Sequence, residues 1–326
     1  MLNILTLITI PAKDVANIKE KFPNAVDIFT KDDNPDLSLI DVLITSPDVH
    51  DDNLMKSLPN LKWVQTVSAG VNFLDLSYIQ EKDIALSNGK GFFSNTIAQT
   101  VLSYILALFR GLPTSLNDMK NHFWDNAVQS KDSWQPGHIQ LKSLNNQKVV
   151  IFGTGSIAQE IVKLLAPFNV DLIGVNRSGK TNDEFPKVYK LSELNEEVFD
   201  ADIVISTLPE TEETKNIYNL DFFELFTSRP VFINVGRGTA VVEKDLVTAV
   251  NENLLSGVGL DVFQSEPLAQ DSPLWDMPNA ILTPHNSGFS QQGAMASLVE
   301  LLGINIASFI EYRTIAKNQV DPKAGY

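Results

Sequence analysis

The chain contains no cysteine and only four histidines. Without cysteine it can form no disulfide bond, and it offers neither a thiolate nucleophile nor a thiolate ligand to a metal. The histidines are His50, His122, His138 and His285, and no two of them have the spacing of a metal-ligand pair. These absences predict a protein without a metal site and without cysteine chemistry.

Positive charge is also scarce, with 25 lysines and arginines against 40 acidic residues and a net charge of −15. Such an excess of acid disfavours non-specific binding to nucleic acid or to an anionic membrane. An acidic protein that binds an anionic cofactor and an anionic substrate must break this excess locally. Arg177 and Arg237, which follow predicted strands, are therefore candidates for binding such anions.

No apolar run approaches the roughly 18 residues of a membrane span. Residues 1–10 are apolar, but they lack the basic region and the small-residue cleavage site of a signal peptide. This segment predicts a first strand, and we expect a cytoplasmic protein. A length of 326 residues, 44% of them hydrophobic, suggests about two domains with ample material for two cores.

The most informative stretch covers residues 148–178. An apolar run at 149–152 predicts a buried strand, and Gly-Thr-Gly-Ser-Ile-Ala follows at 153–158. Apolar residues then recur at helical spacing before a second apolar run at 172–175. Strand, glycine turn, helix and strand in about thirty residues are typical of a dinucleotide-binding unit.

Each part of this turn has a physical role. Gly153 permits the tight turn, Gly155 allows the backbone to approach a pyrophosphate, and the small Ala158 lets helix and strand pack closely. The helix N-terminus adds unpaired N–H groups and a partial positive charge. A glycine-rich turn without a ligand is the alternative, but the full context favours a bound dinucleotide. The predicted contacts here are Gly153, Thr154, Gly155, Ser156 and Ile157.

The end of the second strand bears on the choice of cofactor. NAD enzymes usually carry an acid about twenty residues after the glycines, which binds the ribose 2′-hydroxyl. Here the sequence is Asn176-Arg177-Ser178. Arg177 can bind a 2′-phosphate bidentately, and Asn176 and Ser178 can donate to it. An exposed arginine that NAD ignores is the alternative. The sequence favours NADP(H) over NAD(H).

Strands that alternate with helices elsewhere predict an α/β protein with mostly parallel sheets. A long apolar helix at 93–112 separates two such regions and is expected to be buried between them. The expected strands are 2–10, 25–29, 42–45, 61–67, 84–87, 188–190, 201–207, 230–235, 256–261 and 280–283. The other expected helices are 14–21, 50–58, 191–199, 220–226, 243–251 and a last one that ends near residue 313.

Polar residues follow several of these strands, and ligands of open α/β sheets bind at the carboxyl ends of strands. The turn Ser68-Ala69-Gly70 follows the fourth strand, and its successive N–H groups can form a nest for a carboxylate. A left-handed turn that needs glycine explains it equally well.

Arg237, Glu266 and His285 follow three separate strands in the second region. A buried glutamate beside a histidine favours the imidazolium and fixes its orientation, so that the ring can protonate a ketone oxygen. An arginine can bind a 2-keto-acid carboxylate and polarise its carbonyl. Each residue alone also fits an ordinary role: a surface cation, a loop acid before proline and a capping side chain. Their joint placement favours hydride-transfer chemistry.

With these residues in place, the sequence resembles the D-isomer-specific 2-hydroxyacid dehydrogenases over nearly the whole chain. The resemblance implies two Rossmann-like doubly wound parallel-sheet domains. A dinucleotide-binding domain, 94–286, is inserted into a discontinuous substrate domain, 1–93 and 287–326. The matching segments are 67–71, 152–158, 207–214, 234–238, 260–263, 266–268 and 283–288.

The resemblance also implies roles for individual residues. Arg237, Glu266 and His285 would be catalytic, with His285 as the proton donor in reduction. The N–H groups of Ala69 and Gly70, beside Ser68, would hold the substrate carboxylate together with Arg237 and His285. Further cofactor contacts would be Thr207, Leu208, Pro209, Thr214, Val235, Gly236, Arg237, Asp261, His285, Ser287 and Gly288. Family members are commonly homodimers through the cofactor domain.

The missing acid after the second strand resembles the NADP-using glyoxylate and hydroxypyruvate reductases. We therefore expect NADPH-dependent reduction of a small 2-keto acid to a D-2-hydroxy acid. A non-catalytic nucleotide-sensing protein of the same fold is the alternative, and a methyltransferase is disfavoured by the same missing acid. Candidates for the substrate side-chain pocket, each also explained by core packing, are Phe73, Phe92, Phe93 and Trp134.

Overall fold

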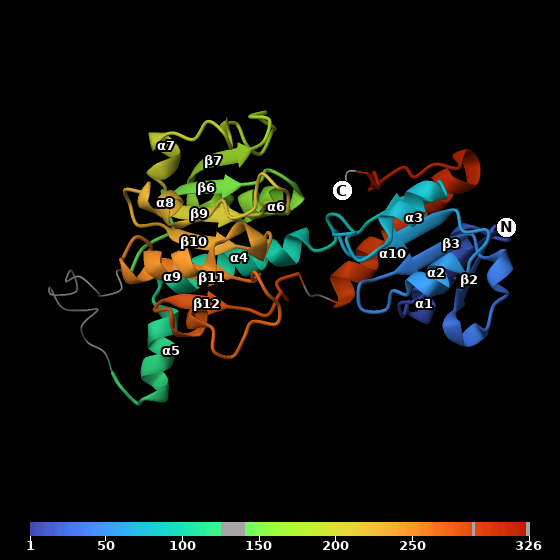
Figure 1. The fold of residues 1–326 in the computed structure, drawn as a ribbon, viewed down its shortest axis with the longest axis horizontal. Coiled ribbons are helices and arrows are strands. Elements are labelled where there is room, and N and C mark those ends of the chain that lie inside the picture. The colour runs from blue at the N-terminus through green and yellow to red at the C-terminus, as the bar shows by residue number, and fades with distance from the viewer. Residues whose placement is uncertain (125–140, 289–290, 324–326) are drawn as a thin grey trace. The chain divides into compact units, whose positions relative to one another are not determined.

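A computed structural model describes residues 1–124, 141–288 and 291–323 (Figure 1). The chain divides into two compact units. Unit 1 comprises Met1–Phe93 and Ser290–Tyr326, and unit 2 comprises Ser94–Phe289. The second crossing between them falls three residues later than the predicted 286/287 boundary. Residues 125–140, which include Trp134 and His138, lie outside the described residues.

Unit 1 is built on a parallel five-stranded sheet in the order β2-β1-β3-β4-β5. The order reverses beside β1, where Ile4 pairs with Ile28 on one side and Val42 on the other. Every residue of β3 and β4 is buried, as expected for central strands covered on both faces. The strands are β1 (Leu2–Thr6), β2 (Val26–Thr30), β3 (Val42–Thr45), β4 (Trp63–Thr66) and β5 (Ala85–Ser87).

Helices cover both faces of this sheet. Alternate residues of a strand point to opposite faces, so Ile4 and Leu5 enter different cores. The core that contains Ile4 is completed by α1 (Ala12–Lys21) and α10 (Gln291–Tyr312). The core that contains Leu5 is completed by α2 (Asp52–Lys56) and α3 (Leu76–Glu81).

One helix of the described chain, α10, contains a window long and apolar enough to cross a membrane, Met295–Tyr312. From the sequence, we expected no apolar run of this length. The apolar side chains of this window pack in the core of unit 1, which accounts for the composition. The buried ones are Leu298, Leu301, Leu302, Ile306 and Phe309.

Unit 2 contains a parallel seven-stranded sheet in the order β12-β11-β10-β9-β6-β7-β8. The order reverses between β6 and β9, and this reversal marks the ligand crevice of doubly wound sheets. The strands are β6 (Lys148–Phe152), β7 (Asp171–Asn176), β8 (Val188–Lys190), β9 (Ile203–Ser206), β10 (Val231–Asn234), β11 (Gly257–Leu260) and β12 (Ala280–Leu282).

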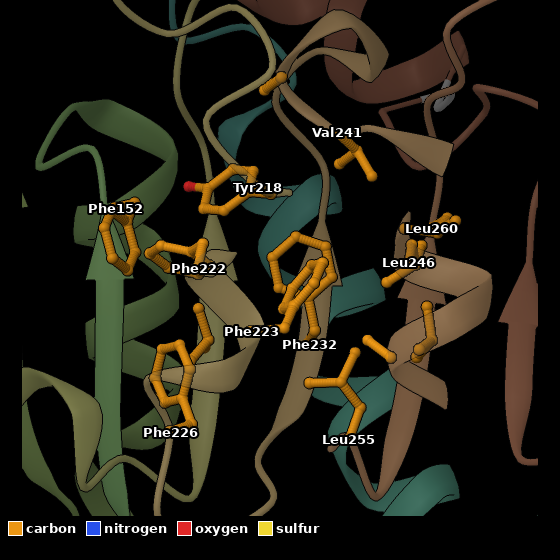
Figure 2. Close-up of a cluster of buried hydrophobic side chains, with 14 of the residues drawn as sticks. Phe152, Tyr218, Phe222, Phe223, Phe226, Phe232, Val241, Leu246, Leu255 and Leu260 are labelled. Atoms are coloured by element: carbon orange, nitrogen blue, oxygen red, sulfur yellow. The ribbon is translucent and has the colours of Figure 1, made fainter. Parts of the chain in front are cut away.

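The two faces of this sheet have different cores. On one face, α4 (Ser94–Phe109) and α6 (Ser156–Leu165) pack over Val149 and Ile151. On the other, α8 (Leu220–Glu224) and α9 (Glu243–Asn251) help to enclose an aromatic cluster (Figure 2). Tyr218 packs edge to face against Phe152, Phe222 and Phe232 in that cluster, with centroids 5.0–5.6 Å apart.

The predicted fold class, α/β with two doubly wound parallel sheets, is confirmed. The predicted boundaries were less accurate. Helix α3 was missed, the predicted helix at 191–199 is confined to α7 (Glu196–Phe199), and the first strand ends at Thr6. Pro113 was expected to end the long helix, but it lies in the first turn of α5 (Leu112–Lys120). Gly111, with φ 64°, separates α4 from α5 and is the N-cap of α5.

Candidate active site

The glycine turn joins β6 to α6 at the sheet reversal of unit 2. Gly153 has φ 94°, a conformation that favours glycine, and a Cβ there would lie 2.5 Å from Oγ1 of Thr207. Its N–H donates to the carbonyl of Val175 at 2.7 Å. Thr207 in turn donates its backbone N–H to the carbonyl of Phe152 at 2.8 Å. Gly153 therefore fits between the ends of its two neighbouring strands.

Gly155 serves a different purpose. A Cβ built on it meets nothing within 4 Å, so the space in front of it is open. Gly155 is the N-cap of α6, and no side chain caps this helix. The first N–H groups of an α-helix have no partner within the helix and favour anions. The turn and the uncapped helix thus present a surface that a pyrophosphate fits. Behind it, Ala158 is fully buried, as predicted for close packing of helix on strand.

The segment after β7 is a tight turn organised by Asn176. Its Oδ1 accepts from the backbone N–H groups of Ser178 (3.0 Å) and Gly179 (2.7 Å). Its Nδ2 donates to Oγ1 of Thr154 and to the carbonyl of Lys180, both at 3.0 Å. Because the amide is fully used, Asn176 holds the turn and ties it to the glycine turn. A direct bond from Asn176 to a 2′-phosphate stays a prediction.

The outward side chains of this turn are basic or hydroxylic. Arg177, Ser178 and Lys180 are all exposed. Within the described residues, the guanidinium of Arg177 has no hydrogen-bond or ion-pair partner. No acid takes the place of the usual 2′-hydroxyl ligand on this turn. The turn therefore presents a cation where a 2′-phosphate would bind.

Close backbone contacts order the loops at the other strand ends. A Cβ on Gly236, after β10, would lie 2.6 Å from the carbonyl oxygen of Leu208, which follows β9. A Cβ on Gly238 would overlap the backbone of Phe263, which follows β11. The absence of both Cβ atoms lets three neighbouring loops pack backbone to backbone. Arg237 lies between these two glycines, so its position is set by both contacts.

Arg237 is half-buried and in an extended conformation, with φ −138° and ψ 140°. Its Nη1 donates to the carbonyl of Gly236 at 2.8 Å, and its own carbonyl accepts from Nδ2 of Asn234 at 2.9 Å. This interaction with its own loop orients the guanidinium and leaves its other donors for a ligand.

His285 and Glu266 form a pair, with Nδ1 of His285 2.7 Å from Oε2 of Glu266. A carboxylate can only accept, so Nδ1 carries the proton and Nε2 is left to face a ligand. The second oxygen of Glu266 accepts from the backbone N–H of Phe263 at 3.0 Å. The expected burial is wrong, since the side chains of His285 and Glu266 are 52% and 36% exposed. Their pairing depends on hydrogen bonds and not on burial.

The segment that carries His285 is held by Asp261, whose exposure is only 2%. Its carboxylate accepts from Oγ1 of Thr283 at 2.5 Å, from the N–H of Asn286 at 3.0 Å and from both the N–H and the hydroxyl of Ser287. A buried carboxylate needs such donors, because an unpaired one costs several kcal/mol. Asp261 and Ser287 thus satisfy each other, and their direct contact with a cofactor stays a prediction.

The remaining predicted cofactor residues line the same strand ends. Thr214 donates its hydroxyl to the carbonyl of Pro209 at 2.7 Å and closes the loop after β9. Leu208 and Val235 are buried, 6% and 5% exposed. Any contribution of these two residues to a ligand would come from the backbone. Among the described residues, no cluster of acidic and histidine side chains is arranged to hold a metal ion.

In unit 1, the turn after β4 is held through its carbonyl groups, and its role in binding a carboxylate stays a prediction. The carbonyls of Ser68, Ala69 and Gly70 accept from the N–H of Gly89 (2.9 Å), Nδ2 of Asn88 (2.7 Å) and Oγ of Ser68 (2.7 Å). Within the described chain, the N–H groups of Ala69 and Gly70 have no partner. The glycine alternative is wrong, because Gly70 is not among the residues with positive φ.

The aromatic pocket candidates of unit 1 all have packing roles. Phe73 packs edge to face on the ring of His50 at 5.3 Å, and Phe92 on Phe93 at 6.4 Å. His50 is itself held by Asp52, 2.9 Å from its Nε2. Trp134 lies outside the described residues.

Several residues that hold the site in place were missed in the sequence. Asn88 fixes the turn after β4, and Thr96, Thr100 and Tyr104 of α4 bind the segment of His285. The signal for the last three is their spacing of four residues, which puts them on one face of the helix. The helix was predicted from its apolar periodicity alone, so the polar contacts of these three residues were not anticipated.

Two doubly wound sheets, one with a glycine turn at its reversal and a histidine–glutamate pair at neighbouring strand ends, define a dinucleotide-dependent dehydrogenase. Comparison with known proteins agrees. The model of the D-isomer specific 2-hydroxyacid dehydrogenase NAD-binding domain matches residues 102–287. The chain belongs to the D-isomer-specific 2-hydroxyacid dehydrogenase family, and it is an enzyme of that family.

Individual relatives cover most of the chain. A glyoxylate/hydroxypyruvate reductase of Arabidopsis thaliana is 28% identical over 265 residues, 81% of this chain and 78% of its own. A family member of known structure from Aeromonas salmonicida is 30% identical with a TM-score of 0.82, covering 98% of this chain and 99% of its own. The NADPH-dependent glyoxylate/hydroxypyruvate reductase of Sinorhizobium meliloti, solved with NADP and sulfate, is 26% identical with a TM-score of 0.76 over the whole of both chains.

The different roles of Gly153 and Gly155 predict different effects of the same substitution. Gly155→Ala places a methyl group in the open space before α6, so we expect the Kd for the dinucleotide to rise about tenfold or more, a loss of about 1.4 kcal/mol. The Tm of the cofactor-free protein should change little. Gly153→Ala, the matched control, should lower that Tm because it strains φ and collides with Thr207. Cofactor titration and calorimetry measure both; an unchanged Kd in Gly155→Ala contradicts the assignment.

Proposed function

We propose that the protein reduces a small 2-keto acid of the glyoxylate or hydroxypyruvate type to a D-2-hydroxy acid, using NADPH. The observation that carries this proposal is the contact of 2.7 Å between His285 and Glu266, in the unit that holds the glycine turn. Relatives named as glyoxylate/hydroxypyruvate reductases support the substrate class. Family members solved with NADP support the cofactor.

Two turns of unit 2 would bind the cofactor. The open face of Gly155 and the uncapped start of α6 would receive the pyrophosphate. Arg177 and Ser178 would bind the 2′-phosphate on the turn that Asn176 holds. When bound, the reduced nicotinamide supplies a hydride to the carbonyl carbon of the keto acid.

The protein's own residues would manage the proton and the negative charge. Reduction of a ketone leaves an alkoxide that needs a proton, and Nε2 of His285 would supply it. Glu266 accepts from Nδ1, so it fixes the orientation of the ring and turns Nε2 toward the ligand. Arg237 would bind the carboxylate and polarise the carbonyl through donors that its own loop does not use. In unit 1, the N–H groups of Ala69 and Gly70, which have no partner within the described residues, could bind a carboxylate.

Removal of the imidazole tests this assignment. His285→Ala should lower kcat by roughly two to four powers of ten, as expected for the loss of a general acid. A circular dichroism spectrum that matches wild type would show that the protein is folded. NADPH absorbance with glyoxylate, hydroxypyruvate, pyruvate and branched 2-keto acids gives the rates.

His122→Asn is the matched control, since His122 is exposed and has a left-handed backbone that asparagine tolerates. It should keep the wild-type rate. Turnover that survives in His285→Ala would refute the role of His285. A wild-type protein that binds NADPH and reduces none of these acids would instead favour the nucleotide-sensing alternative.

Cofactor preference tests the turn after β7. Arg177→Asp removes a charge-assisted contact and adds repulsion, so kcat/KM for NADPH should fall about 10- to 100-fold while that for NADH does not. Arg229→Asp makes the same charge change just before β10, at the amino-terminal ends of the strands and not at their carboxyl ends. It should leave the ratio of kcat/KM for NADPH to that for NADH unaltered. A wild-type preference for NADH would be evidence against NADPH as the cofactor.

We also propose that the protein is a homodimer through unit 2. Leu112, Leu116 and Met119 are exposed on one face of α5, and Phe123 and Trp124 follow, 61% and 79% exposed. Monomers rarely expose apolar patches of this kind. The dimers common in the resembled family use the same domain.

A charge on this face should separate the subunits. Leu116→Glu should halve the mass measured by light scattering, because a carboxylate cannot be buried unpaired in an apolar interface. Asn117→Glu adds the same charge to the neighbouring exposed position and should leave the mass unchanged. If wild type is already monomeric, or Leu116→Glu stays dimeric, this face is not the interface.

A further inference from the structure

Helix α4 carries three hydroxyl-bearing residues at a regular spacing, apart from its other polar residues such as Asn95, Gln99 and Ser103. Thr96, Thr100 and Tyr104 lie four residues apart, so their side chains share one face of the helix. Elsewhere the helix contributes Ala98, Val101, Ile105 and Leu108 to a core of unit 2. We call Thr96, Thr100 and Tyr104 the hydroxyl stripe. A line of polar groups on such a helix calls for a function, because each must find a partner when buried.

Each residue of the hydroxyl stripe has a hydrogen-bond partner within residues 283–288. Oγ1 of Thr96 donates to the carbonyl of Gly288 at 3.0 Å, and Oγ1 of Thr100 lies 3.3 Å from the carbonyl of Ser287. The hydroxyl of Tyr104 is hydrogen-bonded to Oγ1 of Thr283. The stripe therefore binds this segment on both sides of His285.

The direction of these bonds follows from Asp261. Thr283 gives its only hydroxyl proton to that carboxylate, so it must accept from Tyr104. Burial raises the pKa of Tyr104 to about 12, which keeps the phenol protonated and able to donate at any ordinary assay pH. The segment is thus held between a donor stripe on one side and a buried acceptor on the other.

Two contacts show that α4 packs closely against its neighbours. A Cβ on Gly259 of β11 would lie 2.7 Å from Cδ2 of Tyr104, so the tyrosine ring needs a glycine beneath it. At the start of α4, Oγ of Ser94 donates to Oγ of Ser156, the first residue of α6, at 3.0 Å. One helix therefore contacts both the start of the cofactor-binding helix and the segment of His285.

The backbone of His285 needs such support. Its φ of 50° lies in the left-handed region, which costs a residue other than glycine about 1–2 kcal/mol. Its side chain is 52% exposed, so packing does little to fix it. Strained residues of this kind persist where the surrounding structure over-determines them.

We propose that the hydroxyl stripe is a positioning device for His285, which sets the place of its Nε2 relative to the glycine turn. This inference rests on the proposed function, in which His285 donates the proton. Thr96, Thr100 and Tyr104 are positioning residues, since they act through the backbone and Thr283. Thr100 makes the longest of the three bonds to the segment and also lies 3.2 Å from the carbonyl of Thr96, so Thr96 and Tyr104 are the residues to change first.

The test is the double variant Thr96→Val/Tyr104→Phe, which removes both hydroxyls and keeps both shapes. We expect kcat to fall about tenfold, since displacement by about 1 Å can cost as much as a hundredfold. KM for the keto acid and Kd for NADPH should stay within about twofold. Thr96→Ser restores a hydroxyl at the same place and should keep the wild-type kcat. Tyr104→Phe alone should show part of the effect if the double variant folds poorly.

A second comparison separates positioning from general damage. In a His285→Ala background the stripe has no imidazole to position, so the double variant should lower the residual rate no further. The ring Nδ1–H signal of His285, identified by its loss in His285→Ala, should shift or broaden in the double variant in ¹⁵N-histidine NMR.

The possible failures are distinguishable. An unchanged kcat in the double variant, or an equal fall with and without His285, would overturn the positioning role alone if His285→Ala is inactive. Full turnover in His285→Ala would overturn the proposed function and this inference together.

Discussion

The active region of unit 2 depends on backbone lying directly against backbone at the carboxyl ends of its strands. Gly153, Gly236 and Gly238 each occupy a place where a Cβ would collide with the next loop. At Gly236 and Gly238 the colliding atoms belong to the main chain of Leu208 and Phe263, so no rotamer change could relieve the collision. The loops that carry Arg237, Glu266 and the cofactor turn are therefore fixed together, and their side chains are placed by a rigid frame.

On this frame, polar groups are used in pairs that satisfy each other. Asp261 accepts from the segment of His285, and Glu266 divides its two oxygens between that histidine and the N–H of Phe263. In a protein with a net charge of −15, the carboxylates of Asp261 and Glu266 are thus stabilised by hydrogen bonds and not by lysine or arginine. Arg177 and Arg237 are thereby left available for anionic ligands.

Much of the architecture could be predicted from the sequence, because buried parallel strands and the glycine turn leave strong local patterns. Val149–Phe152 and residues 153–158 were sufficient to locate the dinucleotide unit. What failed depends on tertiary contacts: α3 has six residues and little periodicity, and the exposure of Glu266 is not encoded in its neighbours. The hydrogen-bond roles of Asn176 and Asp261 were also invisible, since sequence shows which groups can bind a ligand and not which are already engaged by the protein.

The turn after β7 has a consequence for how the enzyme can diversify. Its conformation is held by the amide of Asn176, through bonds to the main chain of Ser178, Gly179 and Lys180. The outward side chains at 177 and 178 are not needed for that conformation, apart from one hydroxyl contact at Ser178. In the proposed cofactor site, scaffold and specificity are therefore encoded by different residues, so that descendants of this sequence could exchange one nicotinamide coenzyme for the other by point mutation without rebuilding the loop.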